Sequence, residues 1–152
     1  MREVERTHFV AGTSPRELYD IVTDYEHYPR FFPEFTGTRV VSRDGDKVRV
    51  EFRAKMVKEV RYTLDITHRS EGAEIGTSWT FVEGQIVSDS RGAWKFREEN
   101  GGTRIDYRAG IDVKAPLPGF IINKISGAIL GSSIPNMFKA LEKEAAARKK
   151  RQ

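Results

Sequence analysis

Polar side chains that could take part in chemistry fall at inward positions of several predicted strands. Tyr62, Thr77, Glu83 and Tyr107 each alternate in phase with apolar neighbours, which places them on the same strand face as those neighbours. Such groups can orient a carbonyl compound and transfer protons. Their spacing forms no recognised catalytic dyad, so the sequence favours a non-catalytic protein and leaves proton-transfer catalysis as an alternative.

Glu83 has two interpretations. In phase with Trp79 and Phe81 it would point inward, where its carboxylate could anchor a ligand or pair with an arginine. A β-bulge at Gly84 would instead turn it outward.

The sequence predicts no metal site. His8, His27 and His68 are far apart and lack the spacing of metal ligands. The absence of cysteine excludes disulfides, thiolate nucleophiles and cysteine-ligated metals. His27 lies in an aromatic loop, where a pocket-rim or acid–base role and a plain surface position are both open.

Residues 47–56 form the clearest strand pattern in the chain. Charged side chains alternate without a fault with Val48, Val50, Phe52, Ala54 and Met56. A helix would scatter these charges around its circumference, so the segment is a strand with one apolar face. Something must cover that face.

The remaining elements follow from similar patterns. Strands are predicted at 4–10, 38–43, 60–68, 75–83 and 103–113, with another ending at Phe96, and their short turns indicate an antiparallel meander. Ser14, Pro15 and Glu17 mark a helix start with a capping box. An aromatic segment, 25–35, follows it as a short helix or tight loop. A long helix is predicted over 119–148, kinked or interrupted at Pro135.

One helix, about 10 Å wide, cannot cover a flat sheet of seven strands that spans over roughly 30 Å. The sheet must therefore curl around the helix, which gives an α+β fold. The space between them is either a ligand cavity or a core filled by its own aromatic residues. The predicted lining consists of Phe31, Phe35, Phe52, Ala54, Tyr62, Leu64, Trp79, Phe81, Glu83, Trp94, Phe96, Tyr107, Ile121, Ile125 and Ile129.

Two motifs carry a resemblance to a known superfamily. The first is LYDIVTDYEHYPRFFP at 18–33, and the second is WTFVEG at 79–84 followed by GAWKF at 92–96. With the order of elements, they resemble the START/polyketide-cyclase (SRPBCC, Bet v 1-like) superfamily. Within it the chain is similar to the branch of coenzyme Q-binding, ribosome-association toxin and cyclase/dehydrase proteins.

The resemblance implies a helix-grip fold: a seven-stranded curved antiparallel sheet wrapped around a long C-terminal helix, with two short helices after the first strand. It also implies a quinone or lipid in the cavity, bound without metal or cofactor. The chain departs from the branch where Glu34 and Phe35 replace a common Trp-Cys pair, and where 127–135 is rich in Gly and Pro. Both departures lie where a ligand mouth would be, so the ligand's identity does not carry over.

Composition predicts one domain, 1–147, with a basic tail, 148–152. Net charge is +4, and the N-terminus lacks the apolar core of a signal peptide. We expect a cytoplasmic protein, with peripheral contact at the inner face of the membrane if the tail binds anionic lipid. A strand face could bind RNA or simply be solvated; its basic residues are Lys47, Arg49, Arg53, Lys55, Lys58 and Arg61.

The leading hypothesis is non-catalytic binding, transport or chaperoning of a hydrophobic small molecule, such as a quinone, an isoprenoid or another lipid. The alternatives are a ribosome- or RNA-associated regulator and a polyketide aromatase/cyclase.

Overall fold

A computed structural model of the chain describes residues 1–55, 58–114, 118–128 and 133–152. Its centre is a seven-stranded antiparallel sheet in the order β1-β7-β6-β5-β4-β3-β2. Consecutive strands pair from β2 to β7. β1 pairs with β7, so β1 and β2 are the two edge strands. The strands are β1 (Arg2–Ala11), β2 (Phe35–Asp44), β3 (Lys47–Lys55), β4 (Glu59–Arg69), β5 (Glu74–Gly84), β6 (Val87–Glu99) and β7 (Gly102–Val113).

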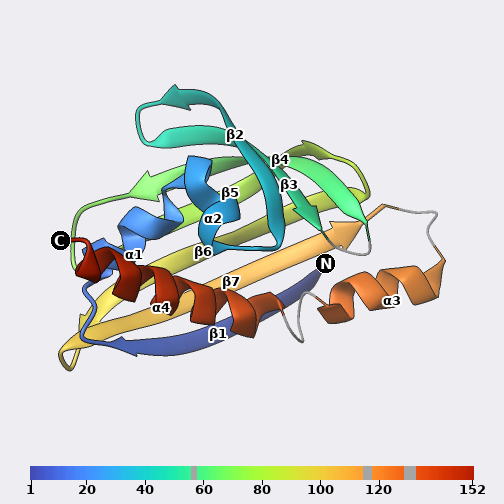
Figure 1. Cartoon of the computed structure of the whole chain (residues 1–152). Helices are drawn as coiled ribbons and strands as arrows, with labels where there is room; N and C mark the ends of the chain where they lie inside the picture. Colours follow the sequence, from blue (N-terminus) through green and yellow to red (C-terminus); the bar gives the residue numbers. More distant parts are fainter. Residues whose placement is uncertain (56–57, 115–117, 129–132) are drawn as a thin grey trace.

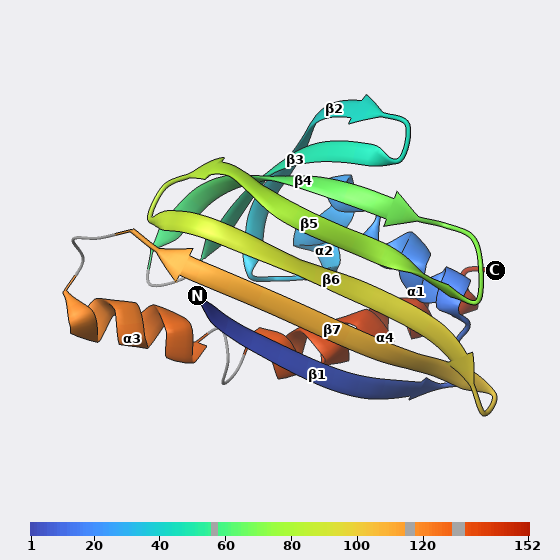
Figure 2. The same ribbon diagram turned by 180° about the vertical axis from the view of Figure 1, so that it is seen from behind.

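The sheet curls around helices that pack against its concave side, and one further helix lies beyond its end (Figure 1). Seen from behind, none of the described helices lies on the opposite face of the sheet (Figure 2). The helices are α1 (Pro15–Val22), the 3-10 helix η1 (Tyr25–His27), α2 (Tyr28–Phe31), α3 (Gly119–Ala128) and α4 (Ile134–Lys150). This arrangement confirms the predicted α+β helix-grip fold.

Local sequence explains how α1 begins. The Ser14 side chain accepts a hydrogen bond from the Glu17 N–H, and the Glu17 carboxylate accepts one from the Ser14 N–H. Pro15 occupies the first turn, where its missing N–H has no helical partner to lose. Leu18 and Ile21 then bury the apolar face of α1 completely.

The predicted long C-terminal helix is two helices in the structure. α3 ends at Ala128 and α4 begins at Ile134, with Pro135 in its first turn. A proline fits the first turn of a helix, because the N–H groups there have no partner within the helix. α4 lies across the concave face, whereas α3 lies beyond the end of the sheet (Figures 1 and 2).

Most of the predicted basic tail, 148–152, belongs to a helix. α4 continues to Lys150. Arg148 forms ion pairs with Asp24 and Glu144, and Lys149 lies 3.7 Å from the Glu17 carboxylate. The last turn of α4 therefore holds the helix against the segment around α1. Within the described residues, no helix combines the length and the apolar character needed to cross a membrane.

Candidate functional site

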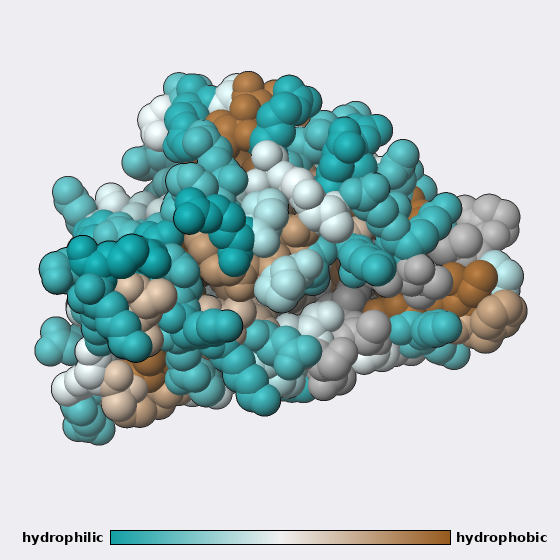
Figure 3. Space-filling view, in the orientation of Figure 1, coloured by the Kyte–Doolittle hydropathy of each residue, from teal (hydrophilic) through white to brown (hydrophobic). Residues whose placement is uncertain are grey.

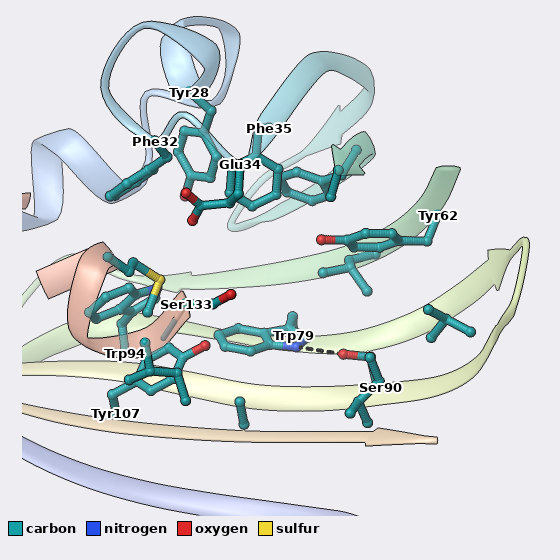
Figure 4. Close-up of a pocket in the computed structure, with 18 of the residues that line it drawn as sticks. Tyr28, Phe32, Glu34, Phe35, Tyr62, Trp79, Ser90, Trp94, Tyr107 and Ser133 are labelled. Atoms are coloured by element: carbon teal, nitrogen blue, oxygen red, sulfur yellow. Dashed lines mark hydrogen bonds between the residues drawn. The ribbon is translucent and has the colours of Figure 1, made fainter. Parts of the chain in front are cut away.

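A cavity of about 200 Å³ lies between the concave face of the sheet, the α2–β2 connection and the start of α4. Figure 3 shows the molecule from the side of Figure 1, with apolar side chains in a central hollow and hydrophilic residues around it. Figure 4 shows the lining from within. It consists of Val4, Tyr25, Tyr28, Phe32, Glu34, Phe35, Phe52, Ala54, Lys55, Tyr62, Leu64, Ile66, Thr77, Trp79, Val87, Ser90, Trp94, Tyr107, Ala109, Gly110, Ile111, Ser133, Ile134 and Met137.

Strand register places the aromatic walls opposite one another. Phe52 on β3 pairs with Tyr62 on β4, and their rings stack with centroids 5.5 Å apart. Trp94 on β6 pairs with Tyr107 on β7, with centroids 4.6 Å apart. Because side chains on one strand face recur every second residue, these pairs project into the same space.

Gly92 makes room for the indole of Trp79. The two residues are directly opposite in the β5–β6 ladder. A Cβ atom at Gly92 would lie 2.3 Å from the Trp79 ring and 2.2 Å from the Arg108 carbonyl oxygen. With that space open, the Trp79 indole lies in the cavity and its Nε1 donates to Ser90 Oγ over 3.3 Å (Figure 4).

The aromatic segment at α2 closes one side of the cavity. The buried Tyr28 hydroxyl donates to the Val22 carbonyl oxygen. Its ring meets those of Phe32 and Phe35 at centroid distances of 5.1 and 5.3 Å. Edge and tilted contacts of this kind stabilise aromatic clusters beyond simple burial. The cluster fixes the turn that carries Glu34.

Glu34 is the acidic residue in this lining. Its carboxyl group points into the cavity (Figure 4), and its carbonyl oxygen accepts a hydrogen bond from the Lys55 N–H over 2.8 Å. Burial raises the pKa of the Glu34 carboxyl, although its own backbone N–H works in the opposite direction. A carboxyl group with a raised pKa retains its proton further toward neutral pH and can then donate a hydrogen bond.

Two tyrosine hydroxyls share the cavity with Glu34. Burial raises the pKa of Tyr62, with further contributions from Tyr107 and Glu34. Burial likewise raises the pKa of Tyr107, and Glu34 adds to that shift. Both hydroxyls therefore stay protonated at neutral pH, and neither has a hydrogen-bond partner in the described part of the chain.

Eight of the predicted lining residues do line the cavity, and their part in ligand binding remains a prediction. They are Phe35, Phe52, Ala54, Tyr62, Leu64, Trp79, Trp94 and Tyr107. Thr77, singled out as an inward polar group, lines it too. Ile129 lies outside the described residues.

Glu83 does not reach the cavity, and the inward interpretation is wrong. Phe81 pairs with Leu64 whereas Glu83 pairs with Thr63, so Val82 is an extra residue in β5. Such a bulge reverses the alternation of side chains beyond it. Glu83 is consequently 67% exposed, with its carboxylate 3.9 Å from Arg61. The predicted bulge exists, two residues before Gly84.

Five other predicted residues lie outside the lining for different reasons. Phe31 packs against Phe32 and beneath the Arg148 guanidinium, and the fully buried Phe96 stacks on Trp94 within the core. Phe81 packs at the margin of the core. Ile121 and Ile125 belong to α3, which lies beyond the sheet.

His27 takes the plain surface position. It is exposed, and its Nδ1 lies 2.8 Å from Asp24 Oδ1. His68 is instead half-buried, with its Nε2 2.7 Å from the Tyr25 hydroxyl, and burial lowers its pKa.

Carboxylates pair with several arginines on the charged strand face. Arg49 contacts Asp65 through two hydrogen bonds of 2.8 and 3.0 Å. Glu51 lies within 4.0 Å of both Arg53 and Arg61. These pairs neutralise much of the positive charge that an RNA partner would need.

Sequence reasoning missed Glu34 as a site residue. One feature of the sequence could have indicated it. Glu34 and Phe35 stand where the resembling branch commonly has a Trp-Cys pair, beside the predicted ligand mouth. It also missed Ser90, Ser133 and Met137, because they lie outside the strand patterns that it used.

Known proteins share this architecture. A protein of Thermus thermophilus matches with a TM-score of 0.82 and 23% identity, over 97% of this chain and 99% of that one. The Zhui aromatase/cyclase from Streptomyces sp. R1128 matches at 0.81 and 14%, over 97% and 94%. A STAR-related lipid transfer protein from Xanthomonas axonopodis matches at 0.77 and 11%, over 96% and 86%. At these low identities, the TM-scores show a likeness of fold alone.

No curated protein matches the chain significantly. The family described as polyketide cyclase / dehydrase and lipid transport matches residues 12–138, which include the aromatic segment, the whole sheet from β2 to β7 and the start of α4. The chain therefore belongs to the polyketide cyclase/dehydrase and lipid transport family.

Proposed function

We propose that the protein binds and carries a hydrophobic small molecule in the cavity, without transforming it. The observation that carries this proposal is a space of about 200 Å³ walled mainly by aromatic and aliphatic side chains. Sites for small molecules combine such walls with a few polar groups that set orientation. Lipid transport in the family description and lipid transfer in a structural relative support the same class of function.

The volume of the cavity limits how much of a ligand it can hold. Cavities for drug-sized ligands usually measure about 300 Å³ or more. A space of about 200 Å³ suits one ring system, or one end of a longer molecule, rather than a whole polyprenyl chain. A quinone or isoprenoid ligand would therefore place only its head or a short segment among these walls.

Filling the cavity tests the proposal. Ala54 is buried in the lining, so Ala54→Leu should displace a bound apolar probe, whereas Ala146→Leu on the exposed face of α4 should not. We expect calorimetric titration with 2-isopropylnaphthalene to show binding to wild type and to the Ala146 variant only. Mass spectrometry of native extracts should find a hydrophobic compound in wild type. The absence of both signals would overturn the proposal.

Glu34 favours a second candidate function, polyketide cyclisation or dehydration. A partly buried carboxyl group with a raised pKa near two tyrosine hydroxyls can serve as a proton donor and acceptor for a poly-ketone. Conversion of a poly-β-ketone that is lost in Glu34→Gln would support it. Binding of the same compound without turnover would leave the carrier function.

A further inference from the structure

We infer that the cavity selects an uncharged ligand whose buried end carries a carbonyl or hydroxyl oxygen, recognised jointly by Glu34, Tyr62 and Tyr107. This inference rests on the proposed carrier function and specifies the chemistry of its ligand. The three groups come from the α2–β2 connection, β4 and β7, and they point into one space (Figure 4).

The two hydroxyls have hydrogen-bonding capacity that no described residue uses. Neither Tyr62 nor Tyr107 has a hydrogen-bond partner among the described residues, whereas the nearby Tyr28 hydroxyl is bonded to Val22. Both hydroxyls are accessible from the cavity, because no fully buried side-chain oxygen or nitrogen among the described residues lacks a partner. A ligand oxygen placed in the cavity can therefore accept hydrogen bonds from them.

The charges around the cavity disfavour an ionised ligand. Among the described lining residues the one cation is Lys55, and its side chain is exposed at the rim. A carboxylate or phosphate placed deep inside would meet Glu34 and two phenols, with no guanidinium or ammonium from this lining beside it. Burying an unpaired charge is far more costly than burying a hydrogen-bonded neutral group.

Glu34 contributes a hydrogen-bond donor to the recognition of the ligand oxygen. The titratable groups that share the cavity lining with it are the Tyr62 and Tyr107 hydroxyls, Lys55, and the hydroxyls of Tyr25 and Tyr28, which are hydrogen-bonded to His68 and Val22. In its protonated form the carboxyl group donates to a ligand oxygen and accepts from a hydroxyl. In its ionised form it would instead prefer a ligand ammonium, which is the competing possibility.

Four probes with the same naphthalene body separate these possibilities. They are 2-isopropylnaphthalene, 2-acetylnaphthalene, 2-naphthoate and 1-(2-naphthyl)ethylammonium. One or two hydrogen bonds predict that wild type binds the ketone about tenfold more tightly than the hydrocarbon. The naphthoate should bind at least about tenfold more weakly than the ketone.

Substitutions identify which residues produce the preference for the ketone over the hydrocarbon. Tyr62→Phe and Tyr107→Phe should each reduce the preference for the ketone by at least about threefold while leaving hydrocarbon affinity within about twofold. Tyr19→Phe, outside the lining, is the matched control and should retain the full preference. Ketone binding should weaken as pH rises through the Glu34 pKa, and Glu34→Gln should remove that dependence.

Each contrary outcome has a distinct meaning. Equal affinity for ketone and hydrocarbon, or an unchanged preference in both tyrosine variants, overturns this inference and leaves the carrier function standing. Tightest binding of the ammonium probe, increasing with pH, also overturns it. Failure of all four probes to bind overturns the proposed function and this inference with it.

Discussion

The Arg148 guanidinium donates to the Asp24 carboxylate over 2.8 Å, which joins the last turn of α4 to the connection after α1. The same guanidinium lies 5.6 Å from the centroid of the Phe31 ring. Residues far apart in sequence thereby hold the helix that covers the cavity against the aromatic segment that closes its side. The stability of the cavity depends on this contact as well as on the sheet.

The Arg148–Asp24 pair should make a modest contribution to stability. Both side chains are more than a quarter exposed, so solvent screens the pair, and we expect a coupling of about 0.5–1 kcal/mol. A double-mutant cycle with Arg148→Ala and Asp24→Asn, followed by urea unfolding, measures it. Arg151→Ala, at a more exposed position, is the control. A coupling within error of zero would contradict the assignment.

Phe52→Ala should destabilise the protein and weaken ligand binding together. Phe52 is 3% exposed and contacts Tyr25, Tyr28, Phe35 and Tyr62. Removing a buried phenylalanine costs about 3–5 kcal/mol, and here it also removes a wall of the cavity. Denaturant unfolding and probe titration measure both effects. Phe120→Ala, on a side chain that is 74% exposed, should change neither.

The sequence was informative about the sheet because each strand has a face that solvent cannot reach. The alternation at 47–56 predicted β3 almost to its ends, and Phe52 and Ala54 proved to be cavity wall. The same alternation failed at Glu83, since one extra residue in β5 reverses every later side chain. Composition near Gly84 suggested a bulge, but only strand pairing determines which residue it contains.

The C-terminal helices show a second limit of prediction from sequence. Apolar residues at helical spacing cannot distinguish one kinked helix from two separate helices, so Ile121 and Ile125 were placed in the cavity. Glu34 shows a third limit of prediction from sequence. Its carboxyl group points into the cavity because of a turn held by contacts of Tyr28, Phe32 and Lys55. Contacts of this kind join distant segments and leave no periodic signal in the sequence.

Gly92→Ala should disturb the cavity through Trp79. The new Cβ would meet the indole and the Arg108 carbonyl oxygen at distances that no real contact shows. The indole must move, and the backbone of the β6–β7 ladder must shift as well to relieve the contact with the carbonyl oxygen, at a cost of at least about 1–3 kcal/mol. A shifted tryptophan emission and weakened probe binding would demonstrate this. Gly12→Ala, where a Cβ meets no atom within 4 Å, controls for glycine loss but carries a positive φ of 65°, so we expect it to affect stability alone.

Reversing charge on the strand face should leave ligand binding intact. Arg49 and Arg53 point away from the cavity and pair with Asp65 and Glu51. Arg49→Glu together with Arg53→Glu should therefore bind 2-isopropylnaphthalene like wild type. Sedimentation with ribosomal subunits at low salt tests the RNA hypothesis in the same variant. Co-sedimentation of wild type that is lost on charge reversal would favour a surface function over the cavity.

Stability should fall with rising pH because of Glu34. Burial raises the pKa of this carboxyl group above its ordinary value of 4.5, so the folded protein holds the proton where the unfolded chain has released it. The bound proton makes its full contribution to the free energy of unfolding below pH 4.5. That contribution is lost as pH rises through the pKa of Glu34 in the folded protein. The free energy of unfolding of wild type should therefore decline relative to Glu34→Gln as pH rises from 4.5 through the raised pKa of the folded protein. His68 and the surface carboxylates titrate in both proteins, so their effects cancel in the difference. A difference that stays constant with pH would show that Glu34 is ionised and solvated in the folded protein.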